Sequence, residues 1–144
     1  MRRIAIASDH GGLALKEELK RFLADQQMDS IDLGTHAADS VDYPDFAHAV
    51  CEEILSCRAD AGILVCGTGI GMSIAANRRR GIRAALCTDP YMARMSREHN
   101  DANVLCLGER VVGTGLALSI ALAFLSSTFA GGRHSRRLAK IDPP

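Results

Sequence analysis

The chain has 144 residues, a length typical of one domain that buries about two-thirds of the surface exposed by its unfolded chain. Lysine and arginine together number 17, as do aspartate and glutamate, so no overall charge favours nucleic acid or another highly charged partner. The longest apolar tract, Leu116–Leu125, is shorter than the ~20 residues of a membrane-spanning helix, and the N-terminus does not resemble a signal peptide. We therefore expect one cytoplasmic domain, residues 1–144, that binds neither nucleic acid nor a membrane.

Two strand–helix pairs are expected first. Arg3–Ala7 is a short apolar strand, and the polar sequence SDHGG ends it. Apolar residues then recur at helical spacing over Leu15–Leu23, while the charged residues among Lys16–Arg21 occupy the other face of that helix. A second strand, Ser30–Leu33, is followed by a polar loop and by a helix that begins near Pro44.

The same alternation continues along the rest of the chain. The remaining expected strands are Ala61–Val65, Ile82–Cys87 and Val104–Leu107, and the helices after them are Met72–Asn77, Asp89–Glu98 and Gly113–Thr128. The last helix is apolar almost all round, which is typical of a deeply buried helix or of a subunit interface. Because near-continuous apolar strands alternate with helices, the sequence predicts an α/β fold whose parallel sheet is covered on both faces.

The most informative stretch is the junction after the third strand. There every second residue from Gly67 to Gly71 is glycine, and a helix follows at once. Bare N–H groups at such a junction can hold an anion or stabilise an oxyanion. Cys66, on which the apolar run Ala61–Val65 ends, would lie in the positive field of these N–H groups, which favours the thiolate. The loop matches neither the Walker A loop nor the dinucleotide fingerprint, and the glycines alone also fit a simple tight turn. We hypothesise a catalytic cysteine beside an oxyanion-stabilising loop.

The five cysteines are odd in number and form no C-x-x-C pair, which favours a reduced, intracellular protein. Cys66, Cys87 and Cys106 end expected strands, and together with His10 they could be considered as zinc ligands. Zinc ligands normally come in close pairs, however, and this spacing is missing. We therefore expect no metal and no cofactor.

Further polar residues fall at the ends of expected elements. Asp9 and His10 follow the first strand, on the same edge of the sheet as Cys66, where ligands bind in such folds. His99, a candidate general acid, and Asn100 end the fourth helix. Helices enter strands from the opposite edge, so His99 would lie far from Cys66 unless a partner subunit supplies it.

Arginines suggest a phosphate site. Arg133 and Arg137 are four residues apart, so on a helix they would share one face and could hold a phosphate, with Arg110 as a third contact. A solvated basic tail is the simpler alternative for residues 131–144. The run Arg78–Arg80 is interpreted as a solvated helix end.

Several motifs together resemble one known family. They are SDHGG, DYPD, CGTGIGMSIAAN, GIRAA, SREHNDANVLCLGER and GGRHSRR, and they are similar to those of the ribose-5-phosphate isomerase B group, which includes the galactose-6-phosphate isomerase subunits. The resemblance covers Arg3 to about Leu138. It implies a metal-independent aldose–ketose isomerase of phosphosugars, with a Rossmann-like three-layer α/β/α sandwich, a five-stranded parallel sheet and a homodimeric assembly.

The resemblance also implies roles for individual residues. Cys66 would be the base that moves a proton between C1 and C2, and His99 would be the acid that opens the furanose ring. The enediolate oxygens would be held by Thr68 and the backbone of Gly67, Gly69, Ile70 and Gly71; the sugar would contact Asp9, His10 and Asn100; the phosphate would contact Arg110, Arg133 and Arg137.

In this family each site uses two subunits, so the basic segment 131–144 is expected to contact the partner. One branch carries a glutamate base directly after the third glycine. Met72 stands there in this chain, so the resemblance assigns it to the cysteine branch.

D-ribose 5-phosphate and D-ribulose 5-phosphate are favoured because the chain keeps the cysteine, the histidines and the arginines together. The alternatives are allose 6-phosphate, galactose 6-phosphate or a tetrulose phosphate, or a non-catalytic phosphosugar sensor that needs neither Cys66 nor His99. The apolar last helix predicts an obligate homodimer; whether dimers pair into tetramers is left open.

Overall fold

The computed structural model describes residues 2–142, and its five strands form one parallel sheet in the order β2-β1-β3-β5-β4. The strands are β1 (Arg3–Ser8), β2 (Asp29–Asp32), β3 (Ala61–Cys66), β4 (Ala84–Leu86) and β5 (Val104–Gly108). The predicted fold, a Rossmann-like α/β/α sandwich with a five-stranded parallel sheet, is confirmed.

The central strands explain the apolar runs in the sequence. Both β3 and β5 are buried along their whole length, because each has neighbouring strands on both sides and helices on both faces. The edge strand β4 is shorter than the expected span Ile82–Cys87. Its first expected residue instead closes a turn, in which Ile82 N donates to Arg79 O at 3.0 Å.

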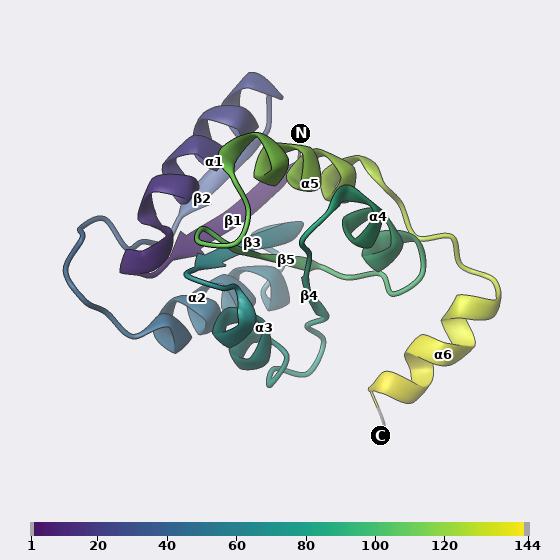
Figure 1. Ribbon diagram of the computed structural model, residues 1–144. Helices are drawn as coiled ribbons and strands as arrows, with labels where there is room; N and C mark the ends of the chain where they lie inside the picture. The colour runs from purple at the N-terminus through teal and green to yellow at the C-terminus, as the bar shows by residue number, and fades with distance from the viewer. Residues whose placement is uncertain (1, 143–144) are drawn as a thin grey trace.

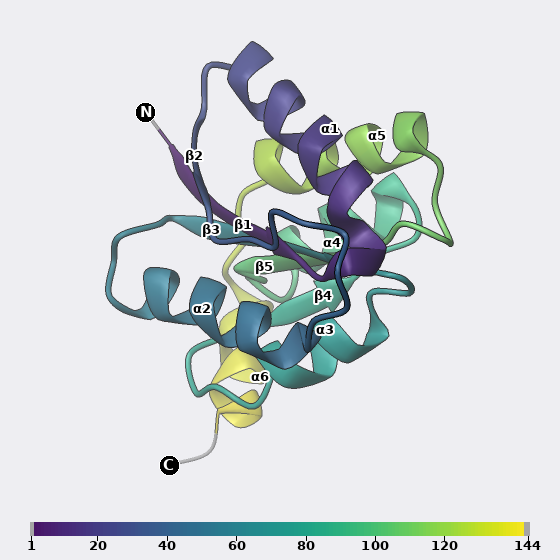
Figure 2. The same cartoon turned by 90° about the vertical axis from the view of Figure 1, so that its left-hand side faces the viewer.

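Helices cover both faces of the sheet (Figures 1 and 2). On one face lie α1 (Leu13–Asp25), α4 (Pro90–Glu98) and α5 (Thr114–Ser126), and on the other lie α2 (Tyr43–Leu55) and α3 (Ile70–Ala76). Side chains of β1 alternate between the two resulting cores, with Ile4 and Ile6 on one side and Ala5 and Ala7 on the other.

Burial in two helices departs from a simple reading of the spacing: α5 is buried on one face only, and α1 buries a lysine that was expected on its solvated face. In α5, Ile120 and Phe124 are fully buried, but Leu116 is 42% and Leu122 46% exposed, so this helix buries only one face. Lys16 was expected on the solvated face of α1. It is completely buried, because its ammonium group is paired inside the protein.

The basic C-terminal segment forms a helix, α6 (Arg133–Ile141), that extends away from the sheet (Figure 1). Asp142, just after α6, lies 3.5 Å from the guanidinium of Arg83. Residues 143 and 144 of the expected tail lie outside the described residues. Across residues 2–142, no helix has both the length and the apolar character required to span a bilayer.

The strand order reverses between β1 and β3. The chain leaves β1 towards β2 on one side, and from β3 onward the strands are added on the other side. Ligands of such sheets bind at the carboxyl ends of strands where the order reverses. The segments that follow β1 and β3, which begin at Asp9 and Gly67, meet at this point.

Candidate functional site

The thiol of Cys66 lies at the carboxyl end of β3, where it is 5% exposed. Gly69 N donates a hydrogen bond to its Sγ at 3.1 Å. Such a donor stabilises a thiolate. Burial raises the pKa of two other cysteines, Cys51 and Cys87, to about 11. The thiols of Cys51 and Cys87 instead donate to backbone carbonyl oxygens, those of Ala76 and Ala85.

The glycine loop exposes backbone donors next to this thiol. Gly69 has a φ of 79°, and a Cβ on it would lie 2.9 Å from the carbonyl carbon of Leu107, so this position requires glycine. The N–H groups of Gly67, Thr68 and Gly71 have no hydrogen-bond acceptor within residues 2–142. The helix that follows, α3, has only seven residues. A helix this short has a weak dipole. A negative charge that develops here would therefore be stabilised mainly by the free N–H groups of the loop.

The turn after β1 packs directly on the glycine loop. Asp9 is 8% exposed, and its Oδ1 accepts from Gly11 N at 2.9 Å. A Cβ on Gly11 would lie 3.3 Å from Gly67 N, so the two loops are in contact. His10 is exposed, and its Nδ1 accepts from Val41 N at 3.2 Å.

The segment after β5 completes this side of the site. Glu109 N donates to Cys66 O at 2.9 Å, and Arg110 N donates to Gly67 O at 3.0 Å. The exposed Arg110 side chain crosses the loop, with Nη1 3.3 Å from the position of a Cβ on Gly67. The structure therefore brings together Cys66, Thr68, the loop glycines, Asp9, His10 and Arg110.

Two residues of this site were not identified from the sequence. The Tyr43 ring, 39% exposed, lies against the loop, with its Cζ 2.6 Å from the position of a Cβ on Gly71. The motif DYPD contains this tyrosine, and an aromatic residue in an otherwise polar loop is a signal that could have found it. Glu109 Oε1 accepts from Leu15 N at 2.6 Å and so ties the start of α1 to the site. No spacing in the sequence predicts that contact.

The other predicted site residues lie elsewhere. The helix α4 begins after the carboxyl end of β4, so it ends at the opposite edge of the sheet, and its C-terminal His99 and Asn100 lie there. The His99 ring stacks on His134 of α6, with centroids 4.2 Å apart and an angle of 12° between the planes. Arg133 and Arg137 are exposed on the same short helix, as their spacing suggested.

Burial, together with the positive charges of His99, Arg133 and Arg137, lowers the pKa of His134 below its ordinary value. A second group of functional candidates thus surrounds the His99–His134 stack. A single chain does not bring this group to Cys66.

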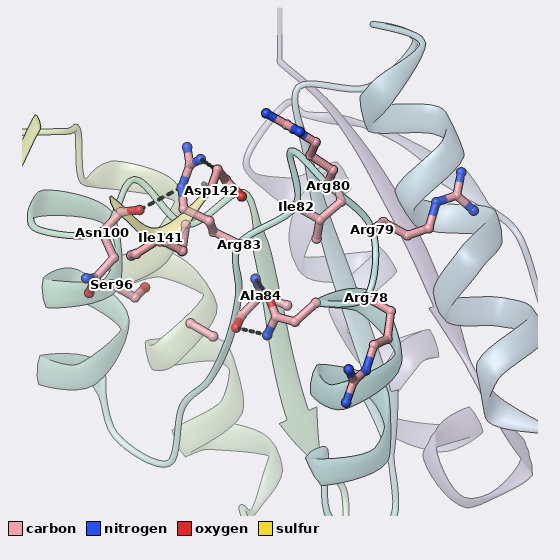
Figure 3. A pocket seen from close by; sticks show the side chains of 13 residues that line it. Arg78, Arg79, Arg80, Ile82, Arg83, Ala84, Ser96, Asn100, Ile141 and Asp142 are labelled. Atoms are coloured by element: carbon pink, nitrogen blue, oxygen red, sulfur yellow. Dashed lines mark hydrogen bonds and ion pairs between the residues drawn. The ribbon is translucent and has the colours of Figure 1, made fainter. Parts of the chain in front are cut away.

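A groove runs along the edge strand β4 beside this second group. One cavity of about 570 Å³ is lined by residues of the α3–β4 connection, of α4 and of the end of α6, and a further cavity of about 300 Å³ shares Ala85, Ser96 and Asn100 with it. Figure 3 shows the guanidinium groups of the run Arg78–Arg80 pointing in different directions. Arg79 pairs with Glu52 at 2.9 Å, so this run is partly paired at the cavity rim and only partly a solvated helix end.

Within residues 2–142, no three His, Cys, Asp or Glu side chains gather closely enough to hold a metal ion.

Comparisons with known proteins agree on one group of enzymes. The family model described as Ribose/Galactose Isomerase matches residues 4–141. Ribose-5-phosphate isomerase B of Escherichia coli (strain K12) is 46% identical over 141 residues, which make up 98% of this chain and 95% of that protein. Two solved structures are similar throughout. Ribose-5-phosphate isomerase B of Clostridium thermocellum is 58% identical, with a TM-score of 0.96 over 97% of this chain and 95% of the other. The type B enzyme of Trypanosoma brucei is 47% identical, with a TM-score of 0.95 over 99% of this chain and 97% of the other.

Proposed function

Because the chain belongs to the ribose/galactose isomerase family, we propose that it interconverts D-ribose 5-phosphate and D-ribulose 5-phosphate, with Cys66 as the base. The observation that carries this proposal is the position of the Cys66 thiol. Its Sγ accepts the Gly69 N–H at 3.1 Å, next to the N–H groups of Gly67, Thr68 and Gly71, which have no acceptor within the described residues. A base and a set of oxyanion donors therefore share one small volume.

In the proposed reaction, the Cys66 thiolate removes the proton from C2 of the open-chain aldose. The electron pair of that C–H bond forms the C1–C2 double bond, and the carbonyl electron pair moves to O1. The N–H groups of Gly67, Thr68 and Gly71 are placed to stabilise the resulting enediolate. The thiol then returns its proton to C1, while the proton of the O2 hydroxyl passes to O1, which leaves the ketone at C2.

Ring opening and phosphate binding require groups that a single chain does not bring to Cys66. His99 and Asn100 lie at the opposite edge of the sheet, and Arg133 and Arg137 lie on α6. We assign these residues to the site of a second copy of the chain, where His99 donates the proton that opens the furanose ring. Arg110 of the first copy would complete the phosphate contacts.

Exposed apolar residues support this homodimer. Ile70 and Ile74 of α3 are 51% and 55% exposed, and Met92 of α4 is 41% exposed beside the groove along β4. A second copy docked along β4 would cover these side chains.

Turnover of several sugar phosphates tests the proposed substrate. The panel is ribose 5-phosphate, allose 6-phosphate, galactose 6-phosphate and a tetrulose phosphate, and we expect the highest kcat/KM with ribose 5-phosphate. An extra methylene changes binding by only ~1–3 kcal/mol, so a tenfold preference for another sugar would replace the substrate assignment without affecting the chemistry at Cys66. Binding of ribose 5-phosphate without turnover of any sugar phosphate would instead indicate a sensor.

A further inference from the structure

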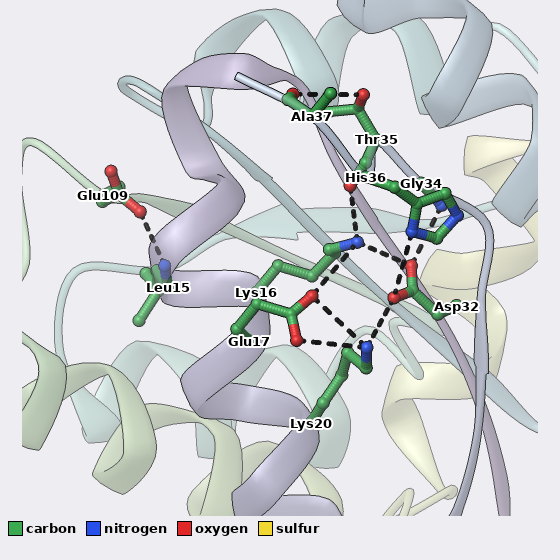
Figure 4. A network of polar contacts seen from close by, with 10 residues as sticks. All are labelled: Leu15, Lys16, Glu17, Lys20, Asp32, Gly34, Thr35, His36, Ala37 and Glu109. Atoms are coloured by element: carbon green, nitrogen blue, oxygen red, sulfur yellow. Dashed lines mark hydrogen bonds and ion pairs between the residues drawn. The ribbon is translucent and has the colours of Figure 1, made fainter.

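A network of charged side chains supports the loop of residues 33–42, which joins β2 to α2 and is called here the β2–α2 loop (Figure 4). Lys16 of α1 is completely buried, and its Nζ donates to Asp32 Oδ1 and to Thr35 O, each at 2.7 Å. Lys20 Nζ lies 2.7 Å from the second oxygen of Asp32 and also pairs with Glu17. One carboxylate thus holds two ammonium groups, but the buried one alone reaches the loop, within the described residues.

The carboxylate of Asp32 keeps its charge over the ordinary range of pH. Burial disfavours the ionised carboxylate of Asp32, but hydrogen bonds from Lys16, from Lys20 and from a backbone N–H outweigh it and hold the pKa at about 2. A buried ammonium group without such a partner would be strongly destabilising. The pair therefore fixes the position of the Lys16 Nζ, and with it the carbonyl of Thr35.

The loop residues held in this way are bonded to the end of β1. Ser8 N donates to Gly34 O at 2.7 Å, and Thr35 N donates to Ser8 O at 2.7 Å. Asp9 and His10 follow Ser8 directly. The start of the β2–α2 loop and the turn after β1 therefore form one unit.

Further along, the same loop determines which ring nitrogen of His10 carries the proton. Val41 N donates to His10 Nδ1 at 3.2 Å, so the neutral ring carries its proton on Nε2, which remains available as a donor to a ligand. The loop then enters α2 at Tyr43, whose ring lies against the glycine loop at Gly71. A path of named contacts thus runs from Lys16 to two groups that line the site.

We propose that Lys16 is a positioning residue that, through Thr35 and the β2–α2 loop, holds His10 in its Nε2-protonated form facing the substrate. This inference rests on the proposed isomerase function, since the sugar phosphate is the ligand that His10 would meet. Lys16 itself is buried and touches no substrate; its effect on the reaction is indirect.

Lys20 provides a matched control. It contacts the same carboxylate as Lys16 and lies on the same helix one turn later, but it has no hydrogen bond to Thr35 within the described residues. Lys16→Met removes the tether and one charge, whereas Lys20→Met removes one charge and leaves the tether. If only the ion pairs with Asp32 mattered, the two variants would affect KM alike.

The test compares the wild type, Lys16→Met and Lys20→Met by two measurements. The first is the ¹⁵N chemical shifts of His10 in the full chain without substrate. The wild type and Lys20→Met should show protonation at Nε2 alone, and Lys16→Met a mixture of both tautomers. The second is steady-state turnover of ribose 5-phosphate. Lys16→Met should raise KM about tenfold with kcat within threefold, because His10 binds ground and transition states alike, and Lys20→Met should leave KM within twofold.

Each other outcome overturns the inference. A wild-type His10 protonated at Nδ1, or equal KM values for the two lysine variants, would contradict it. If Lys16→Met does not fold, Val41→Pro removes the N–H that donates to His10 Nδ1 and should raise KM by a similar factor; an unchanged KM in that variant would also contradict the inference. Absence of turnover in the wild type would instead refute the proposed function, and the tautomer measurement would still decide the role of Lys16.

Discussion

The sulfur of Cys66 and the backbone nitrogen of Gly69 are 3.1 Å apart, and the N–H of Gly69 points its hydrogen at the thiol. The left-handed backbone at Gly69, with a φ of 79°, produces this arrangement. Only glycine can adopt this left-handed conformation without strain and also lie so close to the backbone of Leu107. The donor that favours the thiolate therefore depends on the same glycine that shapes the loop.

Gly69→Ala should damage both stability and catalysis. The left-handed conformation costs roughly 1–2 kcal/mol for a residue with a Cβ, and contact with the Leu107 backbone adds to it. We expect the melting temperature to fall by several degrees and kcat to fall at least tenfold, as measured by calorimetry and turnover. Gly115→Ala is the control, since nothing lies within 4 Å of a Cβ there. Equal effects of the two substitutions would contradict this account of the loop.

The pKa of Asp32 predicts a pH dependence of stability. Its folded pKa of about 2 lies below the ordinary value of 3.8, so its contribution is complete above that value and is lost as the pH falls towards 2. Asp32→Asn should lower the free energy of unfolding at pH 7 by at least about 2 kcal/mol, and the difference should shrink below pH 4. Urea denaturation at several pH values measures it.

The control for Asp32 is Glu18→Gln, which removes an exposed ion pair with Arg21. That substitution should change stability little at any pH. If the wild type and Asp32→Asn differ in stability by the same amount at pH 7 and at pH 2, the charge of Asp32 does not stabilise the fold as described.

His134 should make the protein less stable in mild acid. Its pKa is lowered on folding by burial and by the positive charges around it, so its neutral form is favoured. Its contribution is present above the ordinary histidine value of 6.5 and is lost as the pH falls below it. The fall in melting temperature between pH 8 and pH 5 should be smaller in His134→Phe than in the wild type. An identical fall in both would contradict the assignment.

Coexpression of two inactive variants tests whether each site contains residues of both subunits. In a dimer of Cys66→Ala with His99→Ala, one site carries both substitutions and the other carries neither. Coexpression in equal amounts makes half of all dimers mixed, so activity should recover to about a quarter of the wild-type value. Each variant alone should be inactive. A mixture as inactive as the separate variants would show that Cys66 and His99 act within one chain or not together.

The sequence predicted the features that depend on local pattern. The alternation of apolar strands and helices identified the sheet, and the run of glycines after Cys66 located the loop. The position of His99 at the edge of the sheet opposite Cys66 was also expected, because a helix that leaves one edge of a parallel sheet must end at the other.

Features that depend on contacts across the chain could not be read in this way. Lys16 fits the polar face of a helix by spacing, and its burial follows only from the Asp32 carboxylate on a strand 16 residues later. Tyr43 meets Gly71 only once α2 and α3 pack on the same face of the sheet. The shortness of β4 likewise reflects a turn that involves Arg79.

The central claim is that Cys66 removes the proton from C2, and solvent exchange measures that step directly. In D₂O, ¹H NMR follows the loss of the C2 proton of ribose 5-phosphate in the wild type, in Cys66→Ala and in the exposed control Cys57→Ala. We predict exchange at the wild-type rate in Cys57→Ala and a loss on the order of 10³-fold in Cys66→Ala, with calorimetric binding of the sugar phosphate retained. Exchange in Cys66→Ala within tenfold of the wild type would contradict the account.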